Sequence, residues 1–267
     1  MTMPAQTRCT CAVCGATSEQ TILASTNTMD TPDLDQRPAE MMRSSMSFWL
    51  HECPFCGYIS DELSDNTFVT QQWLQSRDYR ECSGIRFSSG LANRFYRQYL
   101  INLEDKNPEM AFQAALRCAW VCDDCGDSAN AVRCRLLALL SLEEALTRKP
   151  GNEDLLLVRA DLLRRAGMFQ KLQTEYANTR FSSSLKNDIL AFQLEKARQL
   201  DTACYTVRDV QHPYRSALSS GNSDLEGITY PLDLLLRQSD IWTCPACFAG
   251  NRKEHRRCTC CGTERKL

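Results

Sequence analysis

The middle of the chain, from residue 70 to residue 205, mixes apolar Leu and Ala with Arg, Glu and Gln. This mixture is typical of helices with one buried face, so the sequence predicts a mainly α fold. Pro108 and Pro150 separate neighbouring helices, and Gly126 and Gly167 are placed to end helices in a left-handed conformation. We expect helices near 89–104, 108–124, 128–148, 153–166, 168–178 and 183–201.

The helical block contains a weak internal repeat. Ala138, Ala145 and Pro150 follow Gly126 at spacings that resemble the tetratricopeptide repeat, and a second unit ends at Gly167. The resemblance implies antiparallel helical hairpins that pack closely through small residues. The two glycines are 41 residues apart, whereas the usual repeat is about 34 residues. A generic array of helical hairpins is therefore the alternative.

Outside the helical block, cysteine pairs and turn-forming residues dominate. A run from Ser47 to His51 is strand-like, and residues 211–228 are rich in Ser, Gly, Asn and Pro. The predicted fold is a tetratricopeptide-like array flanked by two small zinc-ribbon or zinc-finger modules. The expected divisions are an N-terminal module at 1–65, the array at 66–205, a linker at 206–228 and a C-terminal module at 229–267.

The number of cysteines says more about the function of this chain than its net charge does. The 267-residue chain has a formal net charge of −2, which does not favour general nucleic-acid binding, but it has 16 cysteines. It shows no apolar run long enough for a membrane span and no secretory signal, so we expect a soluble, cytoplasmic protein. Clustered cysteines in a reducing compartment favour metal binding over disulfides.

The N-terminal cysteines form two C-x-x-C-G knuckles, and the four ligands predicted there are Cys11, Cys14, Cys53 and Cys56. Two intervening residues let both sulfurs of a knuckle reach one ion, and the following glycine permits the tight turn. Two knuckles complete a tetrahedral site for structural Zn²⁺. Cys9 and His51 each lie two residues before a ligand; we expect both to be bystanders, although either could replace a ligand.

These motifs resemble a bacterial zinc-binding domain family of unknown function. The carrying sequences are CAVCG, DLDQRP and HECPFCGY, in that order, followed by the helical segment AFQAALRCAWVCDDCGD. The resemblance spans roughly residues 9–200. It implies a metal-binding, repeat-containing protein and no particular reaction.

The C-terminal cysteines follow the pattern W-x-C-x₂-C-x₃-N-x₆-C-x₂-C, which resembles the Ran-binding-protein type zinc finger. The predicted ligands of this second Zn²⁺ are Cys244, Cys247, Cys258 and Cys261. The resemblance implies that Trp242 packs on the hairpins and that Asn251 ties their backbones together. Cys260 is expected to be spare, because Cys258 and Cys261 have the two-residue gap of a knuckle.

Cysteines in the helical block pose a separate question. Cys118, Cys122 and Cys125 share one face of a predicted helix, which could hold a third metal ion. We favour core packing for them, because free cysteine behaves as a small hydrophobe. The same reading is given to Cys82, Cys134 and Cys204, and the nearby acidic cluster of Asp123, Asp124 and Asp127 is expected to cap a helix and face solvent.

No catalytic motif is recognisable, and closed four-cysteine sites are structural, so we expect a protein that is not an enzyme. The leading hypothesis is a scaffold that binds an unknown protein partner and has no membrane contact. The alternative is binding of single-stranded RNA through the C-terminal finger and its basic tail, with help from the stretch Arg94–Tyr99. For that stretch we favour an amphipathic helix with Phe95 and Tyr99 buried and Arg94 and Arg97 solvated.

Overall fold

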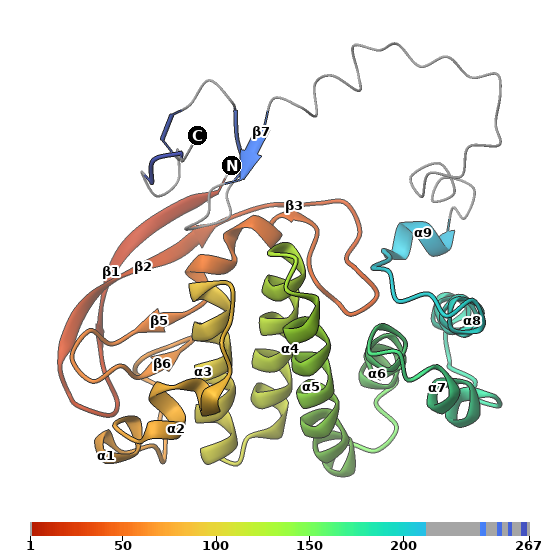
Figure 1. The fold of residues 1–267 in the computed structure, drawn as a ribbon, viewed down its shortest axis with the longest axis horizontal. Coiled ribbons are helices and arrows are strands. Elements are labelled where there is room, and N and C mark those ends of the chain that lie inside the picture. Colours follow the sequence, from red (N-terminus) through yellow and green to blue (C-terminus); the bar gives the residue numbers. More distant parts are fainter. Residues whose placement is uncertain (1, 212–240, 244–249, 253–255, 258–262, 266–267) are drawn as a thin grey trace. The chain divides into compact units, whose positions relative to one another are not determined.

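The computed structural model describes residues 2–211, 241–243, 250–252, 256–257 and 263–265. It divides into two compact units, Met1–Gln211 and His212–Leu267, and each is described by itself. The first unit is mainly helical, with three small two-stranded sheets near its N-terminus (Figure 1). Within the described residues, no helix is both long enough and apolar enough to span a bilayer.

Six helices make up the array, with α3, α4 and α5 side by side in Figure 1. Their bounds lie within a few residues of those predicted, which confirms a mainly helical fold. The six are α3 (Gly90–Glu104), α4 (Pro108–Asp124), α5 (Ser128–Arg148), α6 (Glu153–Arg165), α7 (Phe169–Tyr176) and α8 (Ser184–Arg198). Three short helices also occur: α1 (Gln71–Leu74), α2 (Arg77–Arg80) and α9 (Val207–Gln211).

Local sequence signals explain why the helix ends were predictable. Gly126 and Gly167 have φ values of 69° and 75°, which confirms the left-handed positions. After each glycine the next backbone N–H returns to a carbonyl of the preceding helix, from Asp127 to Cys122 and from Met168 to Leu163, both at 2.8 Å. Side chains cap the N-termini of α3, α4, α5 and α6, and these caps are Ser89, Asn107, Asp127 and Asn152.

The N-terminal module is built from short hairpins. Strands β1 (Met3–Thr10) and β2 (Thr17–Ser25) pair antiparallel, as do β5 (His51–Glu52) and β6 (Ile59–Ser60). A third antiparallel pair, β3 (Thr28–Met29) with β4 (Glu40–Met41), lies within the long segment that connects the two knuckles. In the second unit, β7 (Ile241–Thr243) pairs with β8 (Gly250–Arg252).

The strand predicted at Ser47–His51 is wrong over most of its length. Residues Arg43–Phe48 form a 3₁₀ helix, η1, and only His51 belongs to a strand. Met46 and Leu50 are four residues apart and both buried, so the apolar positions follow a helical period up to the strand. Ser45 stabilises the turn, since its hydroxyl donates to the Met42 carbonyl and accepts from the Trp49 indole.

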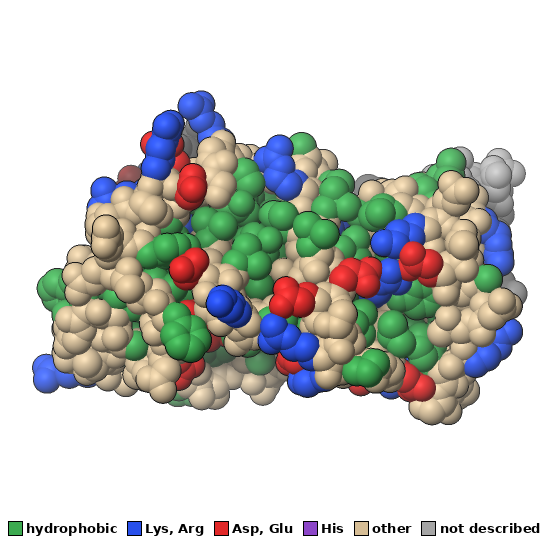
Figure 2. Space-filling view, turned by 90° about the horizontal axis from the view of Figure 1, so that it is seen from below, with side chains coloured by type: hydrophobic (Ala, Val, Ile, Leu, Met, Phe, Trp, Pro, Cys, Tyr) green, Lys and Arg blue, Asp and Glu red, His purple; other side chains and the backbone are tan. Residues whose placement is uncertain are grey.

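Small side chains let the first three array helices pack closely. Fully buried alanines line their contacts, including Ala92 on α3, Ala115 on α4 and Ala138 on α5. On the outside, hydrophobic side chains gather in patches between charged ones on the face shown in Figure 2. The array therefore combines a tightly packed interior with apolar surface, although its tetratricopeptide-like arrangement remains a prediction.

Candidate metal centre

The two N-terminal knuckles have the same backbone conformation. Gly15 and Gly57 have φ values of 71° and 76°, and each donates a 2.9 Å hydrogen bond to the carbonyl of the first cysteine of its knuckle. That cysteine in turn donates its own N–H across the knuckle, Cys11 to Ala16 at 2.9 Å and Cys53 to Tyr58 at 2.8 Å. A side chain at either glycine would be strained at this φ, so the glycines of the motif fix the turn that aims the thiols.

These turns bring all four predicted sulfurs together. Every pair among Cys11, Cys14, Cys53 and Cys56 lies within 4.8 Å. The Sγ–Sγ distances are 3.6 Å for Cys11 with Cys56 and 3.6 Å for Cys14 with Cys53. A tetrahedron of sulfurs about 2.3 Å from a zinc ion has edges of about 3.8 Å. The four thiols can therefore hold one metal ion, with all four positions filled by sulfur.

The protonation of these thiols shows that an ion would have to displace protons. Burial raises the pKa of Cys11 and of Cys56, whereas the backbone N–H of Ala16 lowers the pKa of Cys14. A thiolate is the form that binds metal, so binding here is coupled to proton release. Cys9 and His51 are buried on β1 and β5 but lie outside the group of four, in line with their expected role as bystanders.

Helix α3 holds the second knuckle against the array. The Arg97 guanidinium donates to the Gly57 carbonyl at 3.2 Å and to the Glu52 carboxylate at 3.0 Å, and it lies 4.5 Å from the centre of the Tyr79 ring. Arg94 donates to the Leu50 carbonyl at 2.7 Å. The two arginines were predicted to be solvated, but each donates to a backbone carbonyl of the cysteine module and forms an ion pair with Glu52.

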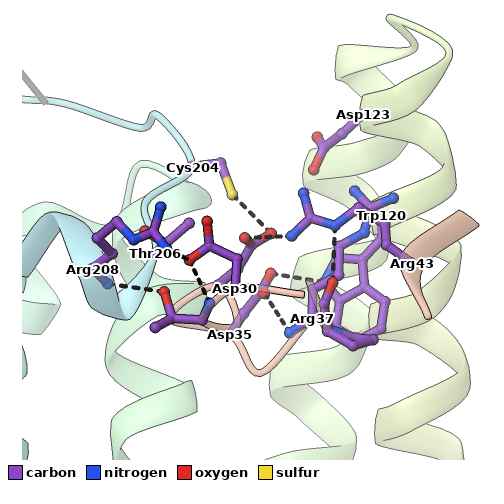
Figure 3. A network of polar contacts seen from close by, with 12 residues as sticks. Asp30, Asp35, Arg37, Arg43, Trp120, Asp123, Cys204, Thr206 and Arg208 are labelled. Carbon is purple, nitrogen blue, oxygen red and sulfur yellow. Dashed lines mark hydrogen bonds and ion pairs between the residues drawn. The ribbon is translucent and has the colours of Figure 1, made fainter. Parts of the chain in front are cut away.

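Residues 30–43, which belong to the long segment between the two knuckles, contact the C-terminal part of the helical array. We call these residues the strap. Its backbone pairs with the start of α9 and the residues just before it, through Leu34 N–H to Tyr205 O at 2.9 Å and Val207 N–H to Pro32 O at 3.0 Å. Figure 3 shows that the strap also places a group of charged side chains against α4.

Asp35 is the most deeply buried charged group of the strap. Its carboxylate accepts from the Trp120 indole at 2.7 Å and from Arg165 at 3.1 Å (Figure 3 shows Asp35 and Trp120). Burial raises the pKa of Asp35, and the nearby carboxylate of Asp161 adds to this effect. The strap is thus fixed by contacts to α4 and α6 that are far apart in sequence.

The acidic cluster at the end of α4 was only partly predicted. Asp127 caps α5, as expected. Asp124, however, binds Arg37 of the strap at 2.9 Å, and Asp123 binds Arg135 and Arg165 at 3.1 and 2.8 Å. These two side chains are tied to arginines rather than free in solvent. Motif reasoning missed this network, although its strap members lie in the DLDQRP sequence.

A second group of cysteines lies inside the helical hairpin of α4 and α5. The sulfurs of Cys118, Cys122 and Cys134 all lie within 4.8 Å of one another, and all three residues are buried. Sulfur–sulfur contacts with Cys118 and Cys122 lower the pKa of Cys134, whereas burial raises the pKa of Cys118. The burial of Cys118, Cys122 and Cys134 agrees with the core packing that we favoured for them. The alternative third site of Cys118, Cys122 and Cys125 has another membership in the structure, because Cys125 caps the end of α4 and lies outside the group, whereas Cys134 faces it from α5.

The remaining cysteine predictions have mixed outcomes. Cys82 is buried, as expected, but Cys204 is exposed and bonds to Asp33 of the strap at 3.2 Å. The predicted C-terminal ligands Cys244, Cys247, Cys258 and Cys261, and the spare Cys260, lie outside the described residues. Of that finger the structure describes a backbone hairpin in which Trp242 pairs with Asn251.

Comparison of the chain with protein-family models, with curated proteins and with solved structures gives no match. The two family resemblances therefore rest on their motifs alone and stay predictions. Among the described residues, the structure brings the cysteines of the two knuckles together and adds a second group, that of Cys118, Cys122 and Cys134, which could also hold metal.

Proposed function

We propose that this chain is a non-enzymatic, zinc-binding scaffold that docks a partner protein on its helical array. The convergence of Cys11, Cys14, Cys53 and Cys56 supports the zinc part of the proposal. Four sulfurs leave no open coordination position, which is the chemistry of structural rather than catalytic zinc. The ion's role is to fix the knuckles against which Arg97 docks, and so to anchor the module on α3.

The docking role is supported by exposed apolar side chains on the outer face of α5. Val132, Leu136 and Leu140 follow one another at intervals of about one helical turn, and their exposed fractions are 38%, 40% and 67%. The outer face of a helix on an array is normally polar. Two turns of exposed apolar side chains, about 12 Å long, match the apolar face of one partner helix.

A partner helix suits this face better than a second copy of the chain. A stable dimer buries about 800 Å² on each partner, and three partly exposed side chains supply far less than that. Arg133 lies at one edge of the apolar row, and Glu143 follows Leu140 by one turn at the end of the row, which would place polar groups at one edge and one end of a docked helix. We therefore commit to an amphipathic helix of another protein as the occupant.

Photo-crosslinking in the protein's own cells tests the proposal. A photoreactive residue at Leu136 should trap one protein, with the crosslinked peptide in a segment whose apolar residues recur every three to four positions. The same residue at Glu195, exposed on α8, is the matched control and should not trap that peptide. Crosslinks to RNA, to a second copy of the chain, or equally from both positions would contradict the proposed scaffold.

A further inference from the structure

The cysteine group inside the α4–α5 hairpin has a closed and specific geometry. Cys118 and Cys122 are one helical turn apart on α4, and Cys134 faces them from α5. The Sγ–Sγ distance between Cys118 and Cys134 is 3.4 Å, and every pair lies within 4.8 Å. The exposed fractions of the three residues are 0%, 1% and 0%, so water does not compete for the sulfurs.

The number of donors limits which ion this group can hold. Among the described His, Cys, Asp and Glu residues, no fourth donor joins the three sulfurs. Structural zinc sites are four-coordinate, so three sulfurs alone do not complete one. Thiolates are the ligands that Cu(I) prefers, and this soft d¹⁰ ion accepts low coordination numbers. Three sulfurs in a plane about 2.3 Å from an ion are about 4.0 Å apart, which falls within the observed range.

We propose that Cys118, Cys122 and Cys134 form a trigonal thiolate site for Cu(I), separate from the zinc site of the knuckles. Binding replaces thiol protons with the ion, and no electron is transferred. Because the site is buried, copper would enter while the hairpin opens or as the chain folds.

The competing explanation is a chain of thiol hydrogen bonds in an ordinary core. Cys134 donates to Cys118, and Cys118 donates to the Ala92 carbonyl at 3.2 Å. This chain satisfies the two thiols without a metal. A measurement of copper, rather than of stability, is therefore needed to separate the two.

The full chain is refolded without oxygen in the presence of zinc and a Cu(I) salt, then dialysed against the Cu(I) chelator bicinchoninate. We expect one copper per chain in addition to the zinc, with X-ray absorption showing three sulfurs about 2.3 Å from copper. Changing both Cys118 and Cys134 to Ala should lower retained copper at least tenfold and leave the zinc content unchanged.

Two single variants are matched controls. Cys125→Ser changes a neighbour of the group that lies outside it, and Cys82→Ser changes a buried cysteine elsewhere. Both should keep the copper. No retained copper in the wild-type chain, copper gained only as zinc is lost, or equal copper in the double variant would overturn the proposal. The wild-type spectrum and the Cys125→Ser result decide the matter even if the double variant does not fold.

Discussion

The indole Nε1 of Trp120 on α4 donates a 2.7 Å hydrogen bond to the carboxylate of Asp35 in the strap. The two residues are 85 positions apart in the sequence, and Asp35 has no exposed surface. A buried carboxylate is costly unless its oxygens are bonded, so this contact helps to fix where the strap crosses the array.

Trp120→Phe should destabilise the chain by about 1–3 kcal/mol, because it leaves a buried carboxylate oxygen with one donor fewer. Urea denaturation of the full chain measures the change. Trp49→Phe is the control, since the Trp49 indole donates to the neutral hydroxyl of Ser45 and is only half-buried. A larger loss from Trp49→Phe than from Trp120→Phe would show that the strap contact contributes little.

Asp123 should make the fold sensitive to acid. Burial opposes its charge, but Arg135 and Arg165 outweigh burial and hold the pKa of the carboxyl below its usual value. A group with a lowered folded-state pKa stabilises the fold above its unfolded pKa of about 3.9, and this contribution is lost as the pH falls through the folded-state pKa.

The free energy of unfolding, measured from pH 6 to pH 3 for wild type and Asp123→Asn, checks this. The difference between the two proteins should be largest at pH 6 and shrink toward pH 3. Asp35→Asn is the control. Because burial raises the folded-state pKa of Asp35, the stability of the wild type relative to this variant should increase, and not decrease, as the pH falls. A difference for Asp123→Asn that does not change with pH would contradict the prediction.

The features that could be predicted from the sequence are those determined by residues close to one another in the chain. Helix ends follow from caps and from the left-handed Gly126 and Gly167, which act within one turn. The knuckles are equally local, because C-x-x-C-G fixes its own turn. The two N-terminal knuckles could be paired because tetrahedral zinc needs four ligands and the two C-terminal pairs already complete a set of their own.

The parts that were missed depend on contacts across the fold. Helical spacing places Cys125 on the face of Cys118, but the helix ends at Cys125 and the third sulfur comes from the next helix. The strap contacts join residues far apart in sequence, and a charged residue in a sequence does not reveal whether it is solvated. Asp123 and Arg97 were therefore both expected in water, whereas each is tied to a partner.

Arg97→Ala should speed the loss of zinc from the knuckle site about tenfold, because Arg97 holds the carbonyl of Gly57, the residue next to Cys56, and outer contacts that support metal ligands affect affinity by that order. Zinc transfer to a coloured chelator measures the rate in the full chain. Arg97→Lys should recover part of the effect, since one donor can still reach the Gly57 carbonyl. Arg77→Ala, which removes an exposed ion pair with Glu81, should leave the rate unchanged.

Zinc counting should separate the ligands from their neighbours. The full chain, purified under reducing conditions, is expected to carry two zinc ions, one for each set of paired knuckles. Cys56→Ser and Cys258→Ser should each lower the count by one, because each removes a sulfur from a four-sulfur site.

Cys260→Ser should leave both ions in place. Cys260 adjoins Cys261, and two neighbouring side chains cannot readily reach one ion, whereas Cys258 and Cys261 have the gap of a knuckle. Metal analysis of the three variants beside wild type is the measurement. If Cys260→Ser lost as much zinc as Cys258→Ser, the C-terminal ligand set would be wrong, and with it the resemblance to the Ran-binding-protein type finger, which requires six residues between Asn251 and its third ligand.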